Sequence, residues 1–222
     1  MYQKLNLYRM KFRDTNRGIG RRKRLTRNPE KLYILAYEGN ETEPQYYHAL
    51  KEQLRHKEGI IKILSLQRPR LMTLSAPKHV FQQLKTYKCN HPTTTEDEFW
   101  MIIDRDRWNL EEWLEKCRLE KNFFVALTNP CFEFWLLLHL FDVTLFAEEE
   151  LLINKKLTKK KRFIDQYLNK QLEGGYQKND IQPERFLPHI FRAIEQAKRF
   201  EGNDLLMQLG SDNYKLIEKL LA

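Results

Sequence analysis

The sequence has few cysteines and no long apolar run. Cys89, Cys117 and Cys131 are odd in number and lack CxxC spacing, which argues against a disulfide framework or a zinc site. The longest apolar stretch, Phe132 to Phe141, contains a glutamate and a histidine and is far shorter than the roughly 20 residues that cross a bilayer. The N-terminus has no apolar stretch of the kind found in secretory signals. We therefore expect a cytoplasmic protein that does not enter the membrane.

A phosphate-binding loop of the form GxxxxGK[ST] is also absent, so any ATPase activity must come from a partner chain. The chain has 222 residues, of which 41% are hydrophobic and 12% aromatic. This composition supports a substantial core and argues against wholesale disorder. The length suits one α/β domain with a helical appendage, or two small domains.

The formal net charge of +9 lies in the first 31 residues, which hold eleven basic and two acidic side chains. Basic and acidic residues balance in the rest of the chain. A basic arm over residues 1–30 can neutralise phosphates and release counterions, which indicates nucleic acid as a partner. A solvated tail that only aids solubility is the alternative. The candidate phosphate contacts in this arm are Arg21, Arg22, Lys23, Arg24 and Arg27.

Short apolar runs alternate with helical periodicities from residue 31 onward. The predicted strands are 32–37, 60–66, 99–103 and 123–127. The predicted helix caps are Thr42, Asn109 (with Glu112) and Asn129. Since consecutive parallel strands need crossover helices, this order predicts a doubly wound, mainly parallel α/β sheet over residues 31–140. Residues 141–222 read as a helical appendage packed on that core.

Acidic residues follow two of the predicted strands. Glu38 comes after the first strand, and Asp104 and Asp106 come after the third. Because parallel strands end at the same edge of a sheet, and alternate residues of extended backbone face the same way, these carboxylates can converge. Converging carboxylates favour a hard divalent cation, Mg²⁺ or Mn²⁺, which supports phosphodiester cleavage. Each acid alone has a simpler interpretation as a turn or cap residue.

Several segments carry a resemblance to a known family. They are ILAYEGNETEPQYY, WMIIDRDRW and TNPCFEFWLLLHL, with the weaker GGYQK and GSDNYKLIEKLL. Over roughly residues 31–222 the chain resembles the RloB-like family, restriction-linked defence proteins with a Toprim domain. The resemblance implies a Toprim-like core in which Glu38 is a metal ligand or acid/base group and Asp104 and Asp106 bind the metal. It also implies that Lys178 neutralises developing phosphate charge, whereas the sequence alone indicates an exposed loop lysine.

Two further features have alternative interpretations. Glu133, near the start of a predicted helix, either stabilises that helix or contributes to a metal site. The run from Lys155 to Arg162, which contains Lys159, Lys160 and Lys161, is either a solvated helix or a second phosphate-binding surface. His139, among leucines, is predicted to be a core histidine.

The favoured function is a metal-dependent endonuclease of a prokaryotic antiviral or restriction-linked system, with DNA and RNA, tRNA included, open as substrates. The family resemblance also implies an ATPase or restriction-system partner, and an oligomer is possible. The alternative is a nucleic-acid-binding or sensor subunit of a defence complex without cleavage activity of its own.

Overall fold

The computed structural model describes residues 31–57, 61–66, 77–105, 109–159 and 161–222. The predicted basic arm, Asp106 and Lys160 lie outside the described residues. No helix in the described ranges is long and apolar enough to cross a bilayer.

A five-stranded sheet forms the centre of the described structure, with the strand order β2-β1-β3-β4-β5. The first four strands pair in parallel, and β5 pairs antiparallel to β4. The strands are β1 (Lys31–Tyr37), β2 (Ile61–Leu66), β3 (Glu98–Asp104), β4 (Phe123–Asn129) and β5 (Gly210–Ser211). The predicted α/β class with a doubly wound, mainly parallel sheet is confirmed, and it is consistent with a Toprim-like fold.

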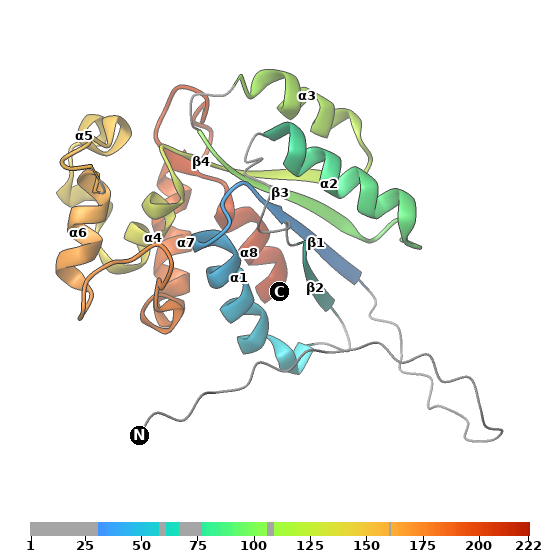
Figure 1. The fold of residues 1–222 in the computed structure, drawn as a ribbon, viewed down its shortest axis with the longest axis horizontal. Coiled ribbons are helices and arrows are strands. Elements are labelled where there is room, and N and C mark those ends of the chain that lie inside the picture. The colour runs from blue at the N-terminus through green and yellow to red at the C-terminus, as the bar shows by residue number, and fades with distance from the viewer. Residues whose placement is uncertain (1–30, 58–60, 67–76, 106–108, 160) are drawn as a thin grey trace, which may run out of the picture.

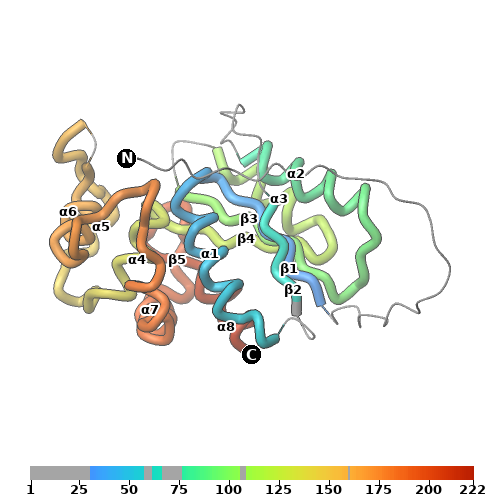
Figure 2. The backbone as a smooth tube through the Cα atoms, turned by 60° about the horizontal axis from the view of Figure 1, so that its bottom comes forward, coloured from blue at the N-terminus to red at the C-terminus, as the bar shows by residue number. Residues whose placement is uncertain are grey.

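Helices cover both faces of the sheet, as Figure 1 shows, with α2 and α3 on one face and α1, α4, α7 and α8 on the other. Helices α5 and α6 lie beyond the β4 and β5 side of the sheet, next to α4 (Figures 1 and 2). The α-helices of the described residues are α1 (Thr42–Gln53), α2 (Pro77–Asn90), α3 (Glu111–Leu119), α4 (Phe132–Leu140), α5 (Glu148–Ile153), α6 (Phe163–Gln171), α7 (Ile190–Ala197) and α8 (Asn213–Leu221).

The alternation of side chains along β1 divides the core into two clusters. Ile34 and Ala36 belong to the cluster with α2 and α3, whereas Tyr33, Leu35 and Tyr37 belong to the cluster with α1, α4, α7 and α8. A strand with both faces covered needs apolar side chains at successive positions, which is the pattern that the sequence shows. The two-sided burial of β1 fixes the position at which Glu38 leaves the sheet.

The C-terminal part contacts the sheet through helices and through β5. Asn213, fully buried at the start of α8, accepts a hydrogen bond of 2.6 Å from the Tyr47 hydroxyl of α1 and donates one of 2.7 Å to Thr128 of β4. Side chains from both sides of residue 140 share one apolar cluster. The division into a core over 31–140 and an appendage over 141–222 stays a prediction.

The three predicted helix caps are wrong. Thr42 is the first residue of α1, and Glu41 is its N-cap. Helix α3 begins after Leu110, one residue beyond Asn109, without a side-chain cap. Asn129 ends β4, and its amide donates to the carbonyls of Leu205 and Gln208, both at 3.0 Å. The side chain of Asn129 therefore binds the loop before β5 and does not cap α4.

Candidate functional site

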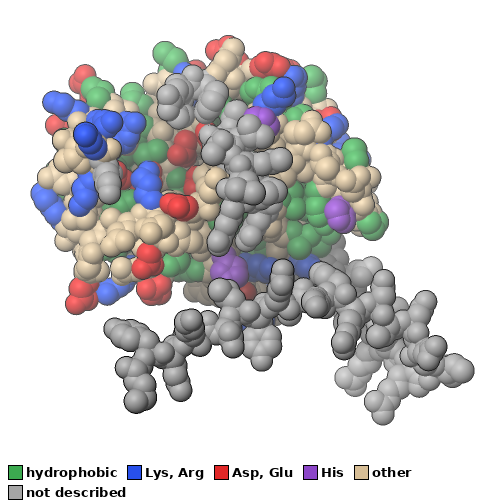
Figure 3. Space-filling model, in the orientation of Figure 1, with side chains coloured by type: hydrophobic (Ala, Val, Ile, Leu, Met, Phe, Trp, Pro, Cys, Tyr) green, Lys and Arg blue, Asp and Glu red, His purple; other side chains and the backbone are tan. Residues whose placement is uncertain are grey.

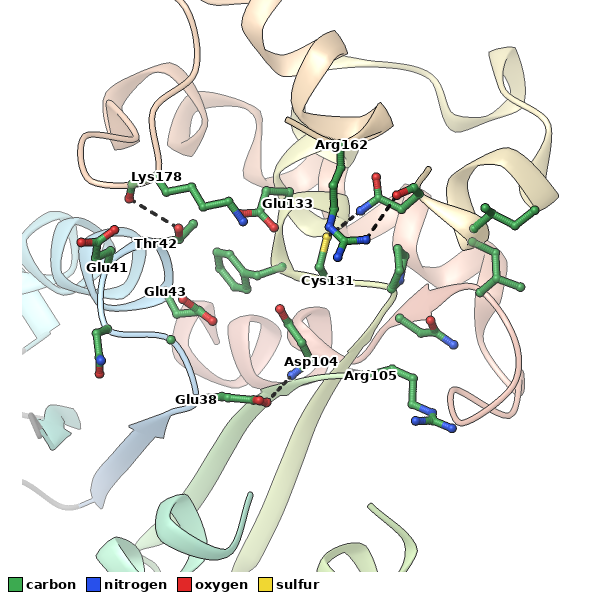
Figure 4. Close-up of a pocket in the computed structure, with 18 residues that line it drawn as sticks. Glu38, Glu41, Thr42, Glu43, Asp104, Arg105, Cys131, Glu133, Arg162 and Lys178 are labelled. Atoms are coloured by element: carbon green, nitrogen blue, oxygen red, sulfur yellow. Dashed lines mark hydrogen bonds and ion pairs between the residues drawn. The ribbon is translucent and has the colours of Figure 1, made fainter. Parts of the chain in front are cut away.

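A cavity of about 660 Å³ opens at the carboxyl edge of the parallel strands. Its walls come from the ends of β1, β3 and β4, the first turns of α1 and α4, the end of α5 and the segment around Lys178 (Figure 4). Acidic side chains are visible inside a hollow of this face, with lysines and arginines beside it (Figure 3). The charged side chains that line the cavity are Glu38, Glu41, Glu43, Asp104, Glu133, Arg105, Arg162 and Lys178.

Glu38 and Asp104 meet at this edge although 66 residues separate them. The backbone N–H of Glu38 continues the pairing of β1 with β3 by donating to the carbonyl of Ile102 at 2.9 Å. The Glu38 carboxylate then accepts the backbone N–H of Asp104 at 3.1 Å (Figure 4). The register of two neighbouring parallel strands thus places both carboxylates at the cavity.

Glu133 and Lys178 form an ion pair inside the cavity. Glu133 lies in the first turn of α4 and is 3% exposed, and Lys178 Nζ is 2.7 Å from its Oε1 atom. The Tyr176 hydroxyl donates to the same oxygen at 3.0 Å. Burial alone would raise the pKa of Glu133, but the charge and hydrogen bonds of Lys178, with hydrogen bonds from Cys131 and Tyr176, hold it below its ordinary value. Glu133 is therefore a carboxylate that stays ionised.

The segment that carries Lys178 is held against the first turn of α1. The Thr42 hydroxyl and the Gln45 side-chain amide donate to the Lys178 carbonyl at 3.5 and 3.0 Å. Gln45 in turn accepts the backbone N–H of Ile181 at 3.3 Å. Lys178 is half-exposed, yet its backbone and its charged end are both fixed, so it is not a freely moving loop lysine.

Glu43 is a member of this site that the sequence analysis missed. It lies in the first turn of α1, is 5% exposed and points toward Asp104 in Figure 4. Burial, followed by the negative charges of Glu133 and Glu38, raises the pKa of Glu43 to about 7. A signal was present: Glu43 is the second residue of a helix that follows a parallel strand, and Glu133 occupies the same position after β4.

Gly39 makes room for the Glu43 carboxylate. A Cβ atom added at Gly39 would collide with the carboxylate group of Glu43. The glycine that follows Glu38 therefore allows a second carboxylate to come close to the turn between β1 and α1.

Asp104 is placed where its charge is unfavourable. Burial and the negative charges of Glu43, Glu133 and Glu38 raise its pKa well above its usual range. The N-termini of α1 and α4 face the same cavity and favour negative charge there. The positive charge of Lys178 also lies at this cavity, but it is paired with Glu133. The raised pKa values of Glu43 and Asp104 thus show that negative charge is unfavourable at both carboxylates.

A divalent cation fits the donor chemistry of the carboxylates in this cavity, because carboxylate oxygens are preferred ligands of Mg²⁺ and Mn²⁺ and a cation relieves their repulsion. Glu38 and Asp104 are the residues that would hold it, with Glu43 lining the same cavity. In the part of the chain that the structure describes, no three acidic, histidine or cysteine side chains are already arranged as a metal site. Asp106, the remaining predicted ligand, lies outside that part.

The interpretation of the basic run from Lys155 to Arg162 as a solvated helix is wrong, and its interpretation as a phosphate-binding surface stays a prediction. Helix α5 ends at Ile153, where Asn154 adopts a left-handed conformation with φ of 42°. A short hairpin follows, closed by a bridge between Lys156 and Arg162, and it leads directly into α6. Lys159 and Lys161 are exposed on this hairpin, so these lysines lie on an exposed basic loop between α5 and α6.

His139 lies in the core, as expected, and not in the cavity. It is fully buried in α4, with Nε2 3.0 Å from the Tyr46 hydroxyl and Nδ1 2.9 Å from the Trp135 carbonyl oxygen. Burial lowers the pKa of His139 to about 3, so it is neutral at physiological pH.

A family model described as "RloB-like protein" matches residues 33–220, which span the sheet, the cavity and the C-terminal helices. No curated protein and no solved structure matches the chain.

Proposed function

The chain belongs to the RloB-like protein family, and we propose that it is a Mg²⁺- or Mn²⁺-dependent endonuclease with a Toprim-type site, which cleaves phosphodiester bonds in nucleic acid. The observation that carries this proposal is the convergence of Glu38 and Asp104 at the ends of two neighbouring parallel strands, inside a cavity that Glu43 and Glu133 also line. Family membership supports a role in prokaryotic antiviral or restriction-linked defence, in the cytoplasm.

A bound Mg²⁺ would polarise a phosphate oxygen and lower the pKa of a water molecule, which is the chemistry that hydrolysis of a phosphodiester needs. Glu38 and Asp104 would hold the cation, with Asp106 as the further ligand that the sequence predicts. The hydrogen bond from the Asp104 amide restricts the Glu38 carboxylate, so this part of the site keeps one geometry.

Lys178 is the cation that would stabilise the additional negative charge of the phosphorane-like transition state. Glu133 positions the ammonium group of Lys178 by direct contact. Tyr176 donates a hydrogen bond to the same Glu133 oxygen and so holds that carboxylate in place. Glu43, with a pKa near 7, is suited to exchange a proton with water or the leaving oxygen at neutral pH.

A nucleic-acid-binding or sensor subunit is the second candidate function. It is favoured by one observation: within the described ranges no three-ligand metal group is preformed, and the Lys178 ammonium is already neutralised by Glu133. Such a subunit would use the basic surfaces and leave cleavage to a partner, for which an ATPase or restriction protein is the class that the family suggests.

Purified full-length protein incubated with tRNA, unstructured RNA, single-stranded DNA and duplex DNA tests the proposal. Each substrate is mixed with Mg²⁺, Mn²⁺ or EDTA, and products are resolved on denaturing gels. Cleavage with metal and none with EDTA is the expected result. Binding without cleavage in every metal would support the second candidate instead.

A further inference from the structure

One wall of the cavity differs chemically from its acidic floor. This wall consists of Leu152 and Ile153 at the end of α5, Asn154 after it, and Arg162 at the start of α6. It combines two aliphatic side chains, a buried amide and a cation, whereas the floor consists of the carboxylates Glu38, Glu43 and Asp104. We call these four residues the α5–α6 wall.

The α5–α6 wall is a built structure rather than a loose loop. Asn154 is 2% exposed, and its side-chain amide lies 3.3 Å from Cys131 Sγ, while its Oδ1 atom accepts the backbone N–H of Ile164 at 3.1 Å. Asn154 therefore ties the end of α5 to the start of α6 and to the turn before α4. These contacts fix the wall relative to the turn before α4, which lines the same cavity.

Arg162 points from this wall into the cavity, as Figure 4 shows. Its backbone N–H donates to Asp165 at 2.8 Å, which fixes the start of α6, and its guanidinium makes a contact of 3.5 Å with the Asn154 carbonyl. A guanidinium has five N–H donors, so a phosphate oxygen can be bound in addition to this contact. Lys155, Lys156 and Lys159 extend the positive surface outside the cavity.

Ile153 presents an apolar surface on the same wall of the cavity as that cation. Its side chain is 61% exposed although it lines the cavity. The other large apolar side chains that are strongly exposed in the described ranges, such as Leu119 and Met207, do not line this cavity. An exposed aliphatic group and a cation on one wall of a cavity suit a ligand with an anionic part and a flat apolar part.

From this arrangement we propose that the α5–α6 wall is a subsite for one unpaired nucleotide beside the scissile phosphodiester. Arg162 binds the phosphate of that nucleotide, and its base lies against Ile153 and Leu152. The subsite makes single-stranded nucleic acid, or an unpaired stretch within a folded RNA, the preferred substrate class. This inference rests on the nuclease proposal, since it concerns the strand that enters the same cavity.

The choice of a single strand over a duplex follows from the position of the apolar surface. In a duplex the bases are paired and stacked inside the helix, so a side chain within a cavity contacts a base face only after the nucleotide has left the stack. A cavity of about 660 Å³ has the size of a small-molecule site. A duplex lying across the entrance would present its phosphates to the lysines of the hairpin, but no base face to Ile153.

The test measures binding without cleavage, in the full-length chain carrying Asp104→Asn. Fluorescent oligonucleotides of about 16 nucleotides, as single strands and as duplexes of RNA and DNA, are titrated by anisotropy at one fixed salt concentration. Ile153→Ser and Arg162→Gln are compared with the parent. Leu119→Ser is the matched apolar control, because Leu119 is also the last, exposed residue of a helix, and Arg118→Gln is the matched cation control.

We expect single strands to bind more tightly than duplexes, with affinity reduced about fivefold by Ile153→Ser and about tenfold by Arg162→Gln, and unchanged in both controls. Equal binding of duplex and single strand, or unchanged affinity in Ile153→Ser, would overturn the subsite but leave the nuclease proposal standing. Absence of binding to every oligonucleotide would overturn both.

Discussion

The side chain of Glu38 accepts the backbone N–H of Asp104 at 3.1 Å, which joins the ends of two parallel strands by a hydrogen bond between candidate metal ligands. The contact exists because β1 and β3 are neighbours in register, with Tyr37 opposite Ile102. One carboxylate is thereby held by the backbone that carries the other. Glu43 and Asp104, which have raised pKa values, complete the acidic floor.

Replacement of Lys178 by methionine removes the cation and keeps most of the aliphatic stem. We expect the rate of cleavage to fall by about 100-fold or more, because a positive group near the transferred phosphate contributes mainly in the transition state. The buried Glu133 carboxylate also loses its partner, so its pKa should rise. Steady-state kinetics measures this effect. The control is Lys121→Met, because Lys121 is an exposed lysine between α3 and β4. Wild-type rates in Lys178→Met would remove this lysine from the catalytic machinery.

Glu43→Gln should stabilise the fold at alkaline pH. The native pKa of about 7 lies above the ordinary value of 4.5, so between these values the native state binds more protons than the unfolded state. The free energy of unfolding therefore falls as pH rises through this window, by an amount on the order of 3 kcal/mol once both states are ionised. Glutamine does not ionise, so Glu43→Gln should not show this fall in the free energy of unfolding. Urea unfolding of Glu43→Gln and of the exposed control Glu41→Gln across this window measures it; parallel pH profiles for Glu43→Gln and wild type would contradict the buried-carboxylate account.

Binding of Mg²⁺ should release protons. Because the pKa values of Glu43 and Asp104 are raised, part of the site is protonated near neutral pH, and a metal must displace those protons. Affinity should therefore be lower at about pH 6 than at about pH 8. Calorimetry in buffers of different ionisation enthalpy gives the number of protons released, which should be smaller in Glu43→Gln. Equal affinity at both pH values and no proton release would show that the cation does not bind among these carboxylates.

His139 should make the fold sensitive to acid independently of the site. Its native pKa of about 3 lies below the ordinary value of 6.5, so the unfolded state takes up a proton first as pH falls. The free energy of unfolding should decrease as pH falls from 6.5 toward 3, and this part of the slope should disappear in His139→Gln. His48→Gln, in an exposed position of α1, serves as control. An unchanged slope in His139→Gln would mean that other groups cause the acid sensitivity.

Much of the fold was predictable because each parallel strand is a short apolar run buried on both faces. β1 and β3 begin and end within one residue of the predicted runs, and this places Glu38 and Asp104 at the same edge. The short β5 was not predictable, since two residues, Gly210 and Ser211, carry no periodicity and pair only through tertiary contacts with β4.

The rest of the site depended on contacts that a sequence pattern does not contain. Glu43 shares its helix position with Glu133, but only the fold shows that its carboxylate is buried beside Gly39 and directed toward Asp104. The basic run after α5 reads as helical, but the left-handed Asn154, tied to Cys131 and Ile164, ends the helix and turns the chain into a hairpin. In both cases a tertiary contact overrides the local preference.

Separate measurement of cleavage and binding in Asp104→Asn and Glu38→Gln tests the account most directly. Both substitutions keep the size of the side chain and remove a carboxylate, so the fold and the basic surfaces should stay intact. With Mg²⁺ and a substrate that the wild-type protein cleaves, we predict that each variant loses cleavage by about 100-fold or more while oligonucleotide affinity is unchanged or higher. Cleavage at the wild-type rate in both variants would contradict the proposal that these two strand-end carboxylates form the catalytic centre.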